Sequence, residues 1–164
     1  MTKNRCFSSV AIPLLAIGIS RAADPPEVKE GLWSIHKQML DNPGNKKSES
    51  TSTICRSHAY DLHVQSLAKA MKGCTIVNKG ENGKYSAELH CVVAGTTVES
   101  KETATYQGNT ATHSETHATY TPPLAGISEM TIITDQKYIG SCPAGVQPGD
   151  LTSADGTVNH LWEH

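Results

Sequence analysis

Alternating apolar and polar side chains dominate this chain and predict β-strands over most of its length. The first clear pattern is GLWSIHKQM, residues 31–39, in which Trp33, Ile35 and Met39 alternate with polar positions. Pro43-Gly44 then marks a turn. The pattern favours a strand with one partly apolar face near the start of the folded region.

One segment has helical periodicity instead. Ser57 is a suitable N-cap, and Gly73 is placed to end the helix. Between these two residues, apolar side chains recur at steps of three and four, which predicts a single amphipathic helix. The stripe consists of Tyr60, Val64, Leu67, Ala68 and Met71.

A hairpin is predicted directly after the helix. Asn82-Gly83 lies between two alternating runs, which is a strong signal for a two-residue turn. This turn places Cys74 opposite Cys91 at a non-hydrogen-bonded pair, where Cα atoms lie roughly 4.5 Å apart. That spacing suits a disulfide. The register also predicts one shared face for Cys74, Ile76, Tyr85, Ala87, Leu89, Cys91 and Val93.

A second hairpin is predicted around Gly108-Asn109, between residues 98–107 and 110–120. A two-residue turn here places Ala104 opposite His113 and Glu102 opposite Glu115. Lys101 then faces Thr116 on the other side. Pro122-Pro123 breaks the strand, and the pattern resumes over residues 127–135. Residues 136–150 and the tail are predicted as loop, because they are rich in glycine and proline.

The composition indicates a small hydrophobic core, because only 5% of the residues are aromatic. A basic start, a short apolar run and Ser20-Arg21-Ala22 predict an export signal over residues 1–22, cleaved after Ala22. Four cysteines then remain. In an exported chain they predict two disulfides, Cys74–Cys91 and, by elimination, Cys55–Cys142. A zinc site is the alternative, but the spacings lack a C-x-x-C pair.

The net charge of the chain after cleavage limits the classes of binding partner that we expect. Removing residues 1–22 also removes Lys3, Arg5 and Arg21, which leaves 11 basic against 16 acidic side chains and a net charge of −5. An acidic chain without a basic patch argues against nucleic acid or an anionic membrane as partner. The expected partner is a small molecule or an envelope protein, with no stable membrane insertion after cleavage.

His113, Glu115 and His117 are the candidate metal ligands, because alternate residues share one face of a strand. They could hold Zn or Cu if a neighbouring strand supplied a further ligand. A solvent-exposed polar face is the competing interpretation. In a third interpretation, His117 hydrogen-bonds to Glu115 or Glu102.

No nucleophile, phosphate-binding or dinucleotide motif occurs, so no catalytic residue is predicted. A hydrolase would need a histidine hydrogen-bonded to a nucleophile, and the sequence offers no such pair. Trp33, Tyr85 and Tyr106 are candidate ligand-binding residues for an apolar cleft. The alternative is that these large side chains belong to the core.

Several motifs resemble the domain-of-unknown-function family 3617, small exported proteins of Gram-negative bacteria. They are the G-L-W start at Gly31, the YQGNT turn at residues 106–110, and YIGSCP followed by PGD at residues 138–150. The similarity runs from about Gly31 to Gly156. The resemblance implies a periplasmic β-rich domain with paired cysteines. It implies no activity, and the histidine triplet departs from the family pattern.

We therefore expect a mainly β (α+β) protein, an antiparallel meander curled as a half-barrel around one helix. Residues 23–30 form a polar lead-in, 31–156 a single domain and 157–164 a tail. The sequence favours a periplasmic or secreted, non-enzymatic binding or envelope accessory protein. Metal binding and hydrolysis are the alternatives.

Overall fold

The computed structural model describes residues 23–162, so the predicted signal segment 1–22 lies outside the described residues. The described part contains one helix and one nine-stranded antiparallel sheet. The mainly β fold with a single helix and two disulfides is therefore confirmed. The elements are β1 Gly31–Asn42, β2 Lys46–Arg56, α1 His58–Ala70, β3 Cys74–Glu81, β4 Lys84–Val93, β5 Thr96–Gln107, β6 Ala111–Leu124, β7 Ile127–Gly140, β8 Asp150–Ser153 and β9 Val158–His160.

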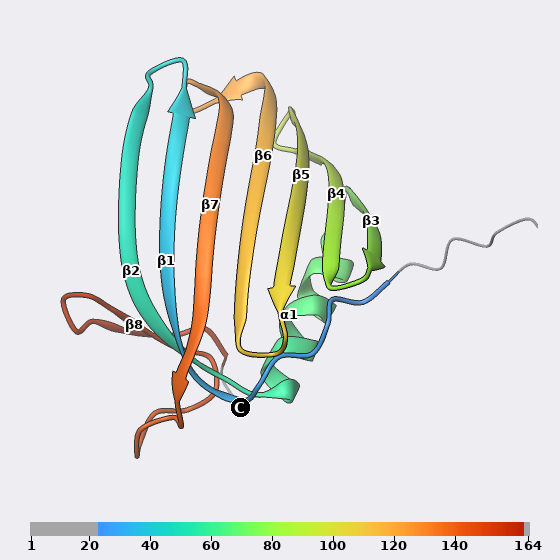
Figure 1. Cartoon of the computed structure of the whole chain (residues 1–164). Coiled ribbons are helices and arrows are strands. Elements are labelled where there is room, and N and C mark those ends of the chain that lie inside the picture. Colours follow the sequence, from blue (N-terminus) through green and yellow to red (C-terminus); the bar gives the residue numbers. More distant parts are fainter. Residues whose placement is uncertain (1–22, 163–164) are drawn as a thin grey trace, which may run out of the picture.

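The strand order is β3-β4-β5-β6-β7-β1-β2-β8-β9, which is not a simple meander. Strands β3 to β7 follow one another, but the β1–β2 hairpin joins the sheet beside β7 rather than beside β3 (Figure 1). Gly31 makes the β1–β7 approach possible, because its φ is +134° and a Cβ there would collide with the Gly140 backbone. The expected meander is thus wrong at its first two strands.

The expected half-barrel is also wrong, because the sheet is not strongly curled (Figure 1). β-Bulges are the usual means of bending a sheet. Here the register shifts lie only between Leu32 and Trp33 and between Thr119 and Leu124, near strand ends. The long middle sections of the strands therefore pair without interruption.

Helix α1 connects β2 to β3, which lie six strand positions apart. That separation is about 29 Å at the usual strand spacing. The 13-residue helix supplies about 20 Å of it. Ser57 caps the helix by accepting a hydrogen bond from the Tyr60 amide, as predicted. We call the sheet face under the helix the inner face and the opposite one the outer face.

The apolar stripe of α1 is incompletely buried. Tyr60 is buried at the start of the helix, but Val64 and Met71 remain 44% exposed and Leu67 53% exposed. A helix that spans a gap between two distant strands is fixed at its ends. Its middle is therefore not forced against the sheet, and a hollow remains beneath it.

The β3–β4 hairpin has the predicted register, with Cys74 paired to Cys91. Asn82 and Gly83 both have positive φ, 50° and 73°, as a two-residue hairpin turn requires. The Cys74–Cys91 disulfide joins Cα atoms 4.0 Å apart. The second disulfide joins Cys55 to Cys142, as predicted by elimination.

The β5–β6 register differs from the prediction by one residue. The loop holds three residues, 108–110, so His113 faces Thr105 and Glu115 faces Thr103. Tertiary hydrogen bonds occupy this loop: the Asn109 carbonyl accepts from Lys29 and the Thr110 carbonyl from Tyr138. Because side chains alternate, the one-residue change places Glu102 on the opposite face from His113 and Glu115.

The C-terminal region is more ordered than predicted. Strand β7 continues to Gly140, β8 and β9 form beyond it, and β6 continues through Pro122-Pro123. Trp162 packs against Tyr60 and stacks on His63 of α1. The tail therefore completes the core, which contains Trp33, Ile54 and Tyr60 with Val28, Ile35, Tyr138, Leu151 and Trp162 packed against them.

The two disulfides should differ in their effect on stability. Cys55–Cys142 closes a loop with a sequence separation of 87, and Cys74–Cys91 one of 17. Chain entropy gives about 4.6 and about 3.1 kcal/mol for these loops. We expect the Cys55→Ala/Cys142→Ala variant to lose about 1.5 kcal/mol more in urea denaturation than Cys74→Ala/Cys91→Ala. Equal losses, or a larger loss for the short loop, would contradict the entropic assignment.

Candidate functional site

A groove lies between α1 and the inner face of the sheet. One part is a hollow of about 380 Å³ over β3, β4 and β5. The apolar stripe of the helix lines one wall of the hollow. The opposite wall is the sheet face whose residues the β3–β4 hairpin register predicted to lie together. The apolar and aromatic side chains around this hollow are Val64, Ala68, Met71, Ile76, Tyr85, Ala87, Leu89 and Tyr106.

The other part of the groove is a hollow of about 470 Å³ over β1, β2 and β7. It is more polar, because Arg56, Asp61 and Gln136 take part in its lining. Tyr106 and Val64 line both hollows. The two parts therefore adjoin and give one groove with an apolar and a polar end.

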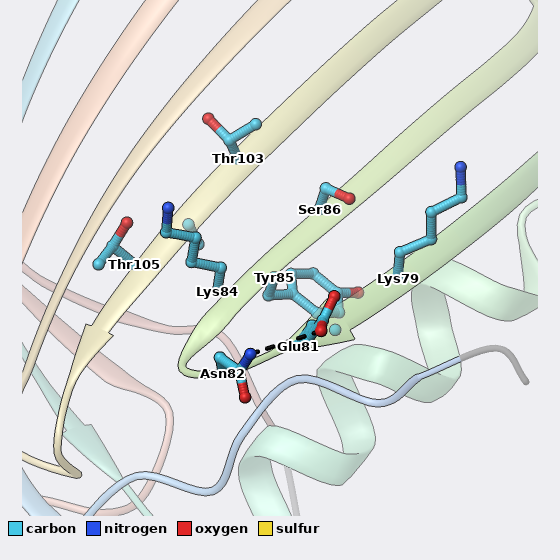
Figure 2. Close-up of a pocket in the computed structure, with 10 residues that line it drawn as sticks. Lys79, Glu81, Asn82, Lys84, Tyr85, Ser86, Thr103 and Thr105 are labelled. Carbon is cyan, nitrogen blue, oxygen red and sulfur yellow. Dashed lines mark hydrogen bonds between the residues drawn. The ribbon is translucent and has the colours of Figure 1, made fainter.

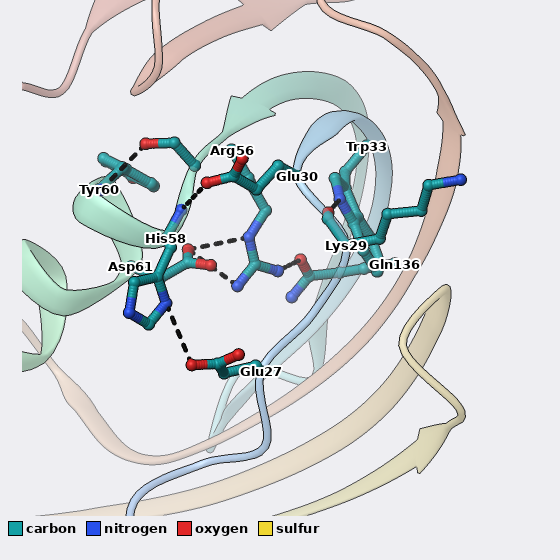
Figure 3. Close-up of polar contacts among 10 residues, drawn as sticks. Glu27, Lys29, Glu30, Trp33, Arg56, His58, Tyr60, Asp61 and Gln136 are labelled. Atoms are coloured by element: carbon teal, nitrogen blue, oxygen red, sulfur yellow. Dashed lines mark hydrogen bonds and ion pairs between the residues drawn. The ribbon is translucent and has the colours of Figure 1, made fainter.

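Arg56 organises the polar end (Figure 3). Its Nε and Nη2 both lie 3.0 Å from Asp61 Oδ1, and its Nη1 donates to Gln136 Oε1 at 3.2 Å. The guanidinium also lies 5.2 Å from the Trp33 ring centre. Burial raises the pKa of Asp61, and the Arg56 charge opposes this rise. Arg56 thus ties the start of α1 to β7 and has its charge neutralised within the protein.

The predicted polar lead-in, residues 23–30, forms part of the groove. Asp24 lies in both hollows and pairs with Lys69 of α1 at 3.0 Å. Glu30 Oε1 accepts from the His58 amide at 2.7 Å, and the His58 ring lies 3.5 Å from Glu27. These contacts hold the lead-in against the helix, and Figure 3 shows those that Glu27 and Glu30 make with His58.

The three aromatic candidates separate into two groups. Tyr85 and Tyr106 line the apolar hollow together. Trp33 is completely buried in the core and lines neither hollow. Burial raises the pKa of Tyr106 to about 12, and burial followed by the Glu102 charge raises the pKa of Tyr85. Both phenols therefore stay neutral at physiological pH.

Sequence reasoning missed several groove residues, among them Asp24, Arg56, Asp61, Glu102 and Gln136. Each comes from a different element, so no sequence motif joins them. Arg56 offered one signal, because an arginine directly before a helix cap can reach the acidic first turn of that helix. The loop at residues 108–110 determined that Glu102 lies on the opposite face from His113 and Glu115.

The predicted metal triplet lies on the outer face. His113 Nδ1 lies 2.7 Å from Asp135 Oδ1, and its Nε2 lies 3.4 Å from Glu115. His117 is instead paired in register with Lys101 and contacts Thr131 at 3.4 Å. The structure therefore brings together two members of the triplet and adds Asp135 from β7.

Within residues 23–162 no group of three or more His, Cys, Asp or Glu side chains is arranged to hold a metal ion. The four cysteines are used in disulfides, which excludes them as a zinc site. Zn or Cu binding by His113, Glu115 and His117 gains no support from this geometry. Exposed histidine–carboxylate pairs describe the outer face better.

The hydrolase alternative gains no support either. The histidine–hydroxyl contacts on the outer face, His36 with Thr51 and His117 with Thr131, are both 3.4 Å long and exposed. His160 has a buried carboxylate partner in Asp150, which also accepts from the Gln147 amide at 2.8 Å. That pair joins the end of β9 to the first residue of β8.

A larger hollow of about 880 Å³ lies at the tip of the β3–β4 hairpin (Figure 2). Its lining is hydrophilic, with Lys79, Lys84, Ser86 and Thr105 among the residues. The two lysine side chains stand apart and do not converge on a common point. We therefore place the candidate binding site in the helix-covered groove.

Fold and groove together define a class of disulfide-linked, single-sheet β proteins with one helix over the sheet. Disulfides are consistent with an extracytoplasmic protein. The sequence pattern of the family described as "Protein of unknown function (DUF3617)" matches residues 28–142. The chain therefore belongs to the DUF3617 family, which confirms the resemblance. A comparison with curated proteins finds no match.

Within the described residues, no helix is long and apolar enough to span a bilayer.

The His113–Asp135 pair should make stability depend on pH. Hydrogen bonds that the His113 ring donates to Asp135 and Glu115 raise the pKa of His113. The pair therefore adds stability below the ordinary histidine pKa of about 6.5, and this is lost as pH rises through the raised value. We expect Asp135→Asn to lower the free energy of unfolding more near pH 5.5 than near pH 8.5. The difference should be at most about 0.5 kcal/mol, because the pair is exposed.

Urea denaturation at both pH values measures this difference, and NMR titration of the His113 ring follows its pKa. Glu88→Gln is the matched control, because Glu88 lies on the same face but pairs with Lys101 at 3.5 Å. Its effect should not change across this pH range. A loss for Asp135→Asn that is equal at both pH values would contradict the assignment.

Proposed function

We propose that this protein is a non-enzymatic, extracytoplasmic binding protein that holds a small amphipathic molecule between α1 and the inner face. The observation that carries the proposal is the groove itself. A 13-residue amphipathic helix leaves the middle of its apolar stripe half-exposed above a partly apolar sheet face. A helix with only a structural role would bury that stripe against the sheet.

The dimensions fit a small molecule. The two hollows measure about 380 and 470 Å³, within the usual range of ligand sites, roughly 300–1,000 Å³. Covering Val64 and Met71 would each contribute roughly 1 kcal/mol, because about half of each side chain is still exposed. The apolar end therefore offers binding energy that the free protein does not use.

The anchoring of α1 supports the same function. Arg56, Asp61 and Trp162 fix the first turns of the helix to the sheet and the C-terminal segment. The other end leads through Gly73 into the Cys74–Cys91 hairpin. Because both ends of the helix are fixed, the groove is preorganised, which lowers the entropic cost of binding. A small molecule fits such a partly enclosed space better than an envelope protein does.

Blocking the groove tests the proposal. Ala68 faces the apolar hollow, whereas Ala70 is exposed and lines neither hollow. We expect the purified protein to bind the neutral probe N-phenyl-1-naphthylamine with a saturable rise in fluorescence. Ala68→Trp should weaken binding by about tenfold or more, since it fills the hollow, whereas Ala70→Trp should not.

Both variants should first be shown to melt at the temperature of the parent protein. The proposal is overturned if the parent protein gives no saturable signal. It is also overturned if Ala70→Trp weakens binding as much as Ala68→Trp does.

A further inference from the structure

Glu102 is the carboxylate of the apolar hollow that has no ion-pair partner among residues 23–162, since Asp24, the other carboxylate there, pairs with Lys69. It lies in the middle of β5 between Ala87 of β4 and Thr116 of β6, all on the inner face. Its side chain is half-buried. Across residues 23–162 it forms no ion pair or hydrogen bond.

The surroundings of Glu102 are apolar and aromatic. Ile76, Leu89 and Met71 line the same hollow, and so do the rings of Tyr85 and Tyr106. The Glu102 charge contributes, after burial, to the raised pKa of both tyrosines, so it lies near both phenols. An ionised carboxylate in such surroundings is costly unless a positive charge neutralises it.

The basic side chains of the groove are already paired. Lys69 lies 3.0 Å from Asp24, and Arg56 lies 3.0 Å from Asp61. The carboxylates that line the two hollows outnumber these two cations. Of the two remaining carboxylates, Glu27 lies 3.5 Å from the His58 ring, and only Glu102 lies in the apolar hollow.

We infer that the ligand of the groove is a protonated amine with an apolar body, whose ammonium group pairs with Glu102 between Tyr85 and Tyr106. The carboxylate accepts hydrogen bonds from the ammonium group. The neutral phenol rings add cation–π attraction, which favours a cation over an anion of the same size. The apolar body extends along Ile76, Leu89 and Met71. This inference rests on the proposed function and specifies its ligand.

A set of ten-carbon probes tests the charge preference. Decylamine, decanol and decanoate, below the concentrations at which they form micelles, compete for the protein against N-phenyl-1-naphthylamine at neutral pH. We expect decylamine to compete about tenfold better than decanoate, because the half-buried Glu102 carboxylate attracts the first and repels the second. Glu102→Gln should bring the two within about threefold of each other. Decanol should compete equally with parent and variant.

Glu99→Gln is the matched control, because Glu99 lies on the same strand but on the outer face, 3.5 Å from His90. It should keep the preference of the parent protein. The preference of the parent protein is itself a test that does not depend on the folding of any variant. If decanoate competes as well as decylamine, or if Glu102→Gln leaves their ratio unchanged, the inference is overturned while the proposed function stands. If neither the fluorescent probe nor any competitor binds, both the inference and the proposed function are overturned.

Discussion

The pairing of β1 with β7 is the constraint on which the rest of this structure depends. It joins residues 31–42 to residues 127–140 and so places the first hairpin at the far side of the sheet from β3. The chain must then return across the inner face to begin β3, and α1 is that return. Gly31 permits the close approach at the end of this pairing, and Cys55–Cys142 fastens the same corner. An amphipathic helix is therefore held over the sheet by its connections rather than by packing along its length.

The groove follows directly from that arrangement. The ends of the helix are secured by the Arg56–Asp61 pair, by Trp162 and by the disulfide-linked hairpin, while its middle stands above the sheet. The lead-in then closes one side of the space through Asp24 and Lys69. A protein with few aromatic residues has little apolar surface with which to build its core. Leaving Val64 and Met71 half-exposed lowers stability, and binding of an apolar ligand would recover that stability.

The two faces of the sheet differ in how their charges are satisfied. On the outer face, His36, His90 and His113 each lie beside a carboxylate, and solvent screens these pairs. On the inner face, Glu102 lies in a partly enclosed apolar hollow without such a partner. In the sequence, the triplet His113, Glu115 and His117 was a stronger candidate for a functional site than Glu102. A lone glutamate in ordinary strand surroundings is the more informative residue once its face is known.

The sequence by itself determined the features that depend on neighbouring residues. Asn82-Gly83 set the register of the first hairpin and with it the Cys74–Cys91 bridge, and Ser57 set the start of the helix. The tertiary structure decided the rest. Insertion of β1 beside β7, formation of β8 and β9, and the loop at residues 108–110 all depend on contacts between distant segments. Since side chains on a strand alternate, the extra loop residue put Glu102 and His113 on opposite faces, and the path of α1 decided that Glu102 faces the groove.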